Sequence, residues 1–139
     1  MKKTKSILSL VLVLVFLFSV PIVSKATIYE GYVGGNYYKC TVTGSSSYIY
    51  SKIKYDEGAQ LKVEVRPFVK YVYYGEHIDL GRFYDYKTAN SSTITYNKTY
   101  AQFSGLYNPS LPANGYFSDC SYDSYIGGTK YLNGALEVF

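Results

Sequence analysis

The feature that most constrains the fold is a strict alternation of apolar and polar residues along several short segments. LKVEVR (residues 61–66) alternates its leucine and valines with lysine, glutamate and arginine. In SYIYSKIKY (47–55), Tyr48, Tyr50 and the two lysines share one side, and both isoleucines lie on the other. In TITYNKTYAQF (93–103), Ile94, Tyr96 and Tyr100 share a side. A period of two is typical of half-buried β-strands, whose successive side chains point to opposite faces.

Polar and glycine-rich segments separate these runs and predict turns, among them residues 34–36, 44–46, 56–58, 75–81, 90–92 and 127–128. Eight strands are predicted between them: Ile28–Val33, Tyr37–Thr43, Tyr48–Tyr55, Leu61–Tyr74, Arg82–Tyr86, Thr93–Phe103, Tyr116–Tyr122 and Lys130–Phe139. Pro67 interrupts its run, and a proline cannot donate a ladder hydrogen bond, so we expect an edge position or a bulge there. The pattern predicts an all-β domain: a small antiparallel β-sandwich, or a partly open barrel, of about seven or eight strands.

The first 26 residues have the layout of a secretory signal peptide that forms a signal helix. Basic residues at 2, 3 and 5 precede the apolar run 7–20, and Ser24-Lys25-Ala26 ends in small residues suited to cleavage. A membrane anchor is the alternative, but a span needs ~20 apolar residues. We therefore predict bacterial Sec-type export, a secreted protein without a stable membrane anchor, and a single domain over residues 27–139.

Removal of residues 1–26 changes the charge balance. Four of the 14 basic residues lie in that segment, whereas all 10 acidic residues lie beyond it. The remaining chain has a net charge of zero, which argues against nucleic-acid binding through phosphate neutralisation. Weak self-repulsion also makes self-association easier.

The two cysteines, Cys40 and Cys120, are an even pair in a chain predicted to be exported. They lack CxxC spacing, so a disulfide is the expected pairing.

Signals for catalysis are few. His77 is the only histidine, which leaves at most one imidazole base and excludes a multi-histidine metal site. A small secreted hydrolase or ribonuclease is an alternative in which His77 pairs with Glu64 or Glu76, while Arg66 or Arg82 holds an anion. We consider an exposed turn histidine the better interpretation.

Asp119 and Asp123 offer a carboxylate pair, but SDCSYDSYIGG lacks the dense oxygen ligands of a calcium loop. Solvated loop acids explain them better than glycoside hydrolysis does. We predict no enzyme activity, no catalytic residues, no metal and no cofactor.

Tyrosine is the anomalous residue: all 19 lie beyond residue 26. Adjacent and alternating tyrosines place rings on both faces of a sheet, so one small core cannot contain them all. An exposed tyrosine combines a stiff apolar ring with a polar tip and suits interfaces and stacking on sugars. The candidate binding surface comprises Tyr37, Tyr38, Tyr48, Tyr50, Tyr73 and Tyr74. The leading hypothesis is a secreted, non-enzymatic binding protein whose partner is an extracellular glycan, a protein or another copy of itself.

YVGGNYYKCTV (residues 32–42) resembles the YGNGV…C…CTV segment of pediocin-like bacteriocins. The resemblance covers about ten residues and lacks the first cysteine of that family's local bridge, so we do not assign the chain to the family. It implies an antibacterial or membrane-active protein as a further alternative.

Overall fold

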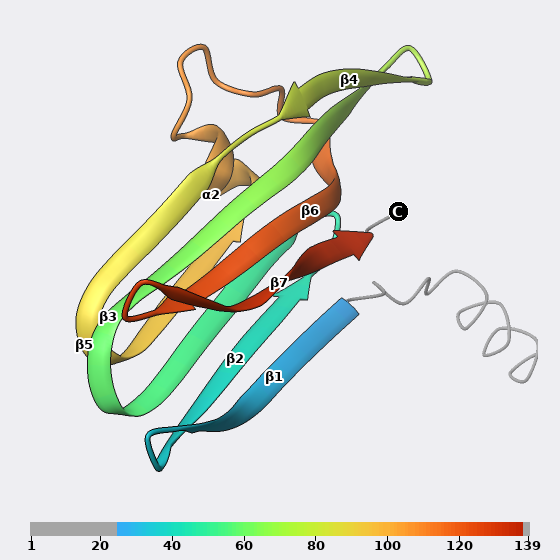
Figure 1. Ribbon diagram of the computed structural model, residues 1–139. Helices are drawn as coiled ribbons and strands as arrows, with labels where there is room; N and C mark the ends of the chain where they lie inside the picture. The colour runs from blue at the N-terminus through green and yellow to red at the C-terminus, as the bar shows by residue number, and fades with distance from the viewer. Residues whose placement is uncertain (1–24, 138–139) are drawn as a thin grey trace, which may run out of the picture.

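The chain forms one seven-stranded antiparallel sheet that is nearly closed into a barrel (Figure 1). Its strands bury every second side chain, and the predicted all-β class is confirmed. The computed structural model describes residues 25–137. Its elements are β1 (Lys25–Val33), β2 (Asn36–Gly44), β3 (Tyr48–Tyr73), β4 (Glu76–Arg82), β5 (Asp85–Thr99), the short helix α2 (Tyr100–Ser104), β6 (Gly115–Ile126) and β7 (Thr129–Glu137).

The 26-residue strand β3 organises the sheet. Its first half pairs with β2 and with the end of β5, whereas its second half pairs with β6, the start of β5 and then β4. Because β3 and β5 bend together, the sheet folds over into two layers around one core (Figure 1). The first layer holds β1, β2 and the first half of β3, and the second holds the latter half of β3 with β6 and β7. Strand β7 lies against β1 and β2, and no ladder joins them within residues 25–137.

The inner faces of both layers supply the core. Apolar side chains of β3 at every second position, such as Ile53, Leu61 and Val63, are fully buried. Phe103 of α2 is fully buried and packs edge-to-face on Phe117 of β6. The layers therefore turn their odd-numbered β3 residues inward and their even-numbered ones outward.

The segment Asp56–Gly58, predicted as a turn, is a bend inside β3. The register with β5 shifts between Lys54 and Ala59, and Gly58 has a φ of +79°. On the partner strand, residues 90–92 were also expected to form a turn, yet they continue β5. The two strands keep their pairing on both sides of the bulge, and this pairing overrides the local turn preference.

The predicted turn at residues 75–81 is shorter in the structure and lies at its N-terminal end. The turn comprises only Tyr74 and Gly75, with φ values of 47° and 79°, and the chain returns at once as β4. Two positive φ values suit the tight two-residue hairpin. The β3–β4 hairpin forms an arm whose tip, beyond the Tyr71–Gly115 pair, extends past the rest of the sheet (Figure 1).

Pro67 lies in the centre of the sheet and not on its edge. It is paired with Cys120, and on its other side the partner passes from β4 to β5, where Phe83 N donates to the Pro67 carbonyl. The β3–β6 register shifts immediately after it, between Phe68 and Val69. The predicted interruption of the ladder is therefore present without an edge.

The predicted strand over residues 93–103 ends at Thr99 because a capping box starts α2. The Thr99 hydroxyl accepts a hydrogen bond from the backbone N–H of Gln102, and the Gln102 side-chain oxygen accepts one from the backbone N–H of Thr99. This reciprocal pair satisfies two amides that the first turn of a helix leaves free.

The predicted disulfide between Cys40 and Cys120 is not formed in this structure, and both thiols are free and buried. Cys40 on β2 and Cys120 on β6 belong to opposite layers. Packed layers lie about 10 Å apart, whereas a disulfide needs Cα atoms within ~7 Å. Burial raises the pKa of Cys40 to about 11 and that of Cys120 to about 12, so both behave as small apolar core residues.

The predicted signal peptide lies outside the described residues except for Lys25 and Ala26, which begin β1. Among the described residues, no helix has the length and apolar character needed to cross a membrane.

Candidate functional site

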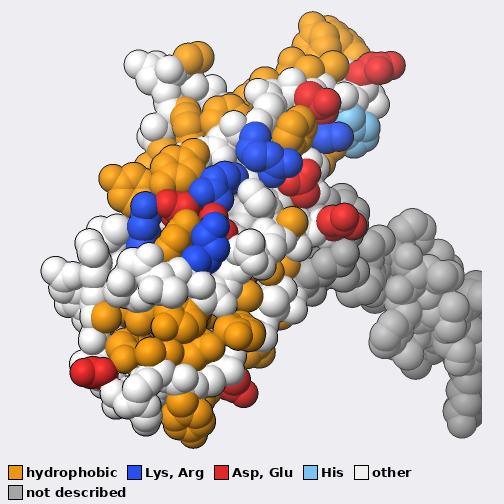
Figure 2. All heavy atoms as spheres, viewed as in Figure 1, with side chains coloured by type: hydrophobic (Ala, Val, Ile, Leu, Met, Phe, Trp, Pro, Cys, Tyr) orange, Lys and Arg blue, Asp and Glu red, His pale blue; other side chains and the backbone are white. Residues whose placement is uncertain are grey.

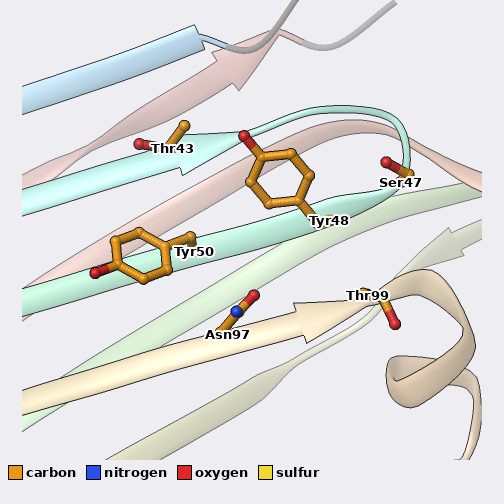
Figure 3. Close-up of a pocket in the computed structure, with 6 residues that line it drawn as sticks. All are labelled: Thr43, Ser47, Tyr48, Tyr50, Asn97 and Thr99. Carbon is orange, nitrogen blue, oxygen red and sulfur yellow. The ribbon is translucent and has the colours of Figure 1, made fainter. Parts of the chain in front are cut away.

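A hollow of about 470 Å³ lies on the outer face of the first layer, and we call it the Tyr48–Tyr50 pocket (Figure 3). Its volume falls within the range typical of small-molecule sites. The pocket is lined by Thr43 of β2, Ser47 of the turn before β3, Tyr48 and Tyr50 of β3, and Asn97 and Thr99 of β5.

Strand alternation places the two rings in this pocket. Ile49 is buried, so Tyr48 and Tyr50 on either side of it point outward together. The register then sets Tyr50 between Thr43 and Asn97 on the neighbouring strands. The polar residues thus flank the aromatic ones (Figure 3).

Two of the polar groups are fixed by local structure. The Thr99 hydroxyl caps α2, so its position is tied to the helix start. The Ser47 and Ser45 hydroxyls lie 3.0 Å apart in the turn between β2 and β3. By contrast, the Tyr48 and Tyr50 hydroxyls and the Asn97 amide make no hydrogen bond to another side chain within residues 25–137. They are available to a ligand.

The lining is uncharged and combines two apolar ring surfaces with hydroxyl and amide groups. Aromatic rings stack on the C–H faces of sugars, while hydroxyl and amide groups exchange hydrogen bonds with sugar hydroxyls. The pocket therefore has the chemistry needed to bind a neutral sugar.

The remaining tyrosines of the predicted surface lie elsewhere. Tyr37 donates to the Glu30 carboxylate at 2.5 Å, and this hydrogen bond raises the pKa of Tyr37 to about 12. Tyr38 is in the core, where its ring lies 5.9 Å from that of Tyr29 and 4.9 Å from that of Tyr131. Tyr38 therefore contributes nothing to an exposed surface.

Tyr73 and Tyr74 lie at the tip of the β3–β4 arm, where their rings pack edge-to-face at 4.6 Å. Tyr74 is 90% exposed. The six predicted tyrosines thus occupy separate places, and only Tyr48 and Tyr50 share a pocket.

His77 lies on β4 near this tip and is exposed, with Nδ1 2.5 Å from the Tyr116 hydroxyl. It pairs with Val72 of β3, eight residues from Glu64 along the same strand. At ~3.3 Å per residue the two positions are about 26 Å apart. The structure therefore does not bring the histidine together with Glu64 as an acid–base pair.

Arg66 and Arg82 were the two arginines considered for an anion site. Arg82 donates to Asp119 at 2.6 Å and to the Arg66 carbonyl. Asp123 lies in a separate ion pair with Arg66 at 2.8 Å. Within residues 25–137, no three histidine, cysteine or carboxylate side chains gather where they could hold a metal ion.

Thr43, Asn97 and Thr99 were not recognised from the sequence as lining residues. Each is an ordinary polar strand residue, and only the cross-strand register places it beside a tyrosine. The alternation in residues 47–55 was the one signal that pointed to this face.

Comparison with known proteins gave no match: no protein-family model, no curated protein and no solved structure is significantly similar to this chain.

Proposed function

We propose that this protein is a secreted, non-enzymatic binding protein that holds an extracellular glycan in the Tyr48–Tyr50 pocket. The observation that carries the proposal is the pair of outward rings on one strand, flanked by uncharged polar side chains in a single hollow. The leader-like residues 1–26 support export.

The absence of charged side chains from the lining favours a neutral glycan over an acidic one. Lys52 follows Tyr50 on the same face but is not among the lining residues. A neutral sugar ring offers both an apolar face for Tyr48 and Tyr50 and hydroxyls for Thr43 and Asn97.

The experiment is a depletion assay with the protein lacking residues 1–26 and three insoluble probes: chitin, cellulose and purified peptidoglycan. We expect binding to at least one probe and about a tenfold weaker affinity for each ring removed in Tyr48→Ala and Tyr50→Ala, equivalent to ~1.4 kcal/mol per ring.

Tyr32→Ala is the matched control. Tyr32 is 74% exposed on the same outer face, but it lies at the opposite end of the β1–β2 hairpin. We expect it to bind like the unmodified protein. Absence of binding to all three probes, or equal binding by the Tyr48→Ala/Tyr50→Ala variant, would contradict the proposal. Size-exclusion chromatography of the same samples tests self-association, and a dimer dissociated by the double variant would assign the rings to self-contact instead.

A further inference from the structure

The outer face of the second layer carries a charged network that the Tyr48–Tyr50 pocket does not involve. Lys62, Glu64 and Arg66 point outward from β3 because the apolar residues between them face the core. Glu64 is directly opposite Asp123 of β6 in the ladder. These two carboxylates are only 7% and 8% exposed, although they lie on the outer face.

Three basic side chains cover the two carboxylates. Lys62 Nζ lies 2.6 Å from Glu64 Oε1, and Arg66 bridges Glu64 at 2.6 Å and Asp123 at 2.8 Å. Lys130 Nζ of β7 lies 3.4 Å from the other Asp123 oxygen. Three positive charges against two negative ones leave this network a net charge of +1.

The exposed part of the network consists of donors. The carboxylates are buried and their oxygens are already in contact with cations, whereas the three basic side chains are each about one third exposed or more. An ammonium has three N–H donors and a guanidinium five, so each cation keeps donors that no contact in the network uses. Figure 2 shows the basic side chains gathered across this face with acidic ones between them.

Tyrosine rings flank these cations. Lys62 Nζ lies 5.4 Å from the Tyr86 ring centroid and 5.8 Å from that of Tyr125. Both rings line a groove of about 480 Å³ together with Gln60, Lys62, Glu64, Thr88 and Gly128. The groove, which we call the Lys62 groove, therefore holds an ammonium between two aromatic surfaces, and this ammonium is paired with the largely buried Glu64 carboxylate of the same lining.

We propose that the Lys62 groove is a second binding site, which takes an anionic polysaccharide. The Tyr86 and Tyr125 rings stack on successive sugar faces, and the free donors of Lys62 bind the anionic substituent. Glu64, which also lines the groove, holds the ammonium in place through the 2.6 Å contact, and its two oxygens are already occupied by Lys62, Arg66 and the Tyr84 hydroxyl. A carboxylate of a uronate or a sulfate ester would each provide the oxygens that this site requires.

The first probe is polygalacturonate, with binding measured by titration calorimetry at low salt. We expect Lys62→Gln and Tyr86→Ala each to weaken binding about tenfold, and added salt to weaken it further because exposed charges are screened. Lys52→Gln is the matched control for charge: it removes a lysine from the outer face of the other layer and should leave the affinity unchanged. Thermal unfolding of each variant checks that the fold is retained.

Dextran sulfate and neutral dextran complete the test. If dextran sulfate binds and polygalacturonate does not, and Lys62→Gln removes that binding, the anion is a sulfate ester. Unchanged affinity in both Lys62→Gln and Tyr86→Ala, or equal losses in Lys52→Gln, would overturn the proposal, as would equal binding of neutral dextran. The Tyr48→Ala/Tyr50→Ala variant should keep its polygalacturonate affinity, so this proposal and the proposed function can fail separately.

Discussion

Two buried tyrosines differ in whether the hydroxyl is hydrogen-bonded, and this difference predicts opposite effects of the same substitution. Tyr96 donates to Asp85 at 2.7 Å, whereas the Tyr100 hydroxyl has no partner among the described residues. We expect Tyr96→Phe to lower the free energy of unfolding by about 1.5–3 kcal/mol, as for a hydrogen bond to a charged group. Tyr100→Phe should be neutral or stabilising, because it removes an unsatisfied buried hydroxyl. Urea unfolding of the two variants side by side measures both, and equal losses would contradict the assignment.

The contribution of Glu64 to the free energy of unfolding is expected to depend on pH. Burial alone raises its pKa, but hydrogen bonds from Lys62 and Tyr84 and the charges of Lys62 and Arg66 lower it overall. A lowered folded-state pKa stabilises the fold above the unfolded-state pKa, and this contribution is lost as the pH falls through the folded-state value. Glu64→Gln should therefore cost about 1–3 kcal/mol at pH 7 and progressively less towards pH 3. Urea unfolding at several pH values tests this, and a cost that grows on acidification would contradict it.

The free thiols of Cys40 and Cys120 should be unreactive in the folded protein. Their raised pKa values leave almost no thiolate at pH 8, and only the thiolate reacts. We expect an alkylating reagent to modify neither cysteine in the folded protein and both after unfolding in urea without reductant. Intact mass spectrometry distinguishes the states. Modification of both thiols only after addition of reductant would instead reveal the disulfide that the cysteine count favoured.

At the scale of the elements, the bend in β3 depends on Gly58. Its φ of +79° costs an L-residue roughly 1–2 kcal/mol, although a Cβ would meet no atom closer than 3.7 Å. Gly58→Ala should therefore destabilise the fold by about that amount through backbone strain. Gly105→Ala is the control, because Gly105 already has a helical φ of −66°. Thermal unfolding compares them, and an equal loss in both would exclude the strain at the bend as the cause.

The local pattern predicted which residues face the core in three segments, 47–55, 61–66 and 93–99, but it did not predict how the strands join. The alternation in residues 47–55 and 61–66 predicted the correct faces, because successive side chains of a strand point to opposite faces of the sheet. The Asp56–Gly58 segment was interpreted as a turn because glycine and acidic residues favour turns locally. Only the partner strand β5, more than 30 residues away, makes it a bend. The capping box Thr99-x-x-Gln102 was readable in the sequence and was missed within a longer alternating run.

The candidate site was predictable to a similar degree. Tyr48 and Tyr50 were among the candidates because their outward direction follows from alternation alone. Their polar neighbours, and the opposition of Glu64 to Asp123, depend on cross-strand register, which no short segment contains. Tyr38 was assigned to the surface because adjacent tyrosines must face opposite ways, and the sequence did not indicate which of Tyr37 and Tyr38 faces inward.

At the scale of the whole molecule, the two proposed sites lie on the outer faces of opposite layers, separated by the shared core. A ligand in the Tyr48–Tyr50 pocket therefore does not obstruct the Lys62 groove. If both proposals hold, one molecule joins a neutral insoluble glycan to a soluble acidic one. We expect fluorescent polygalacturonate to be retained on chitin, or on whichever neutral probe binds, only when the protein is present. Tyr48→Ala/Tyr50→Ala should abolish retention by releasing the protein from the solid, whereas Lys62→Gln should leave the protein bound and release the polygalacturonate. Retention that persists in either variant, or competition between the two polymers for one molecule, would contradict two independent sites on opposite faces.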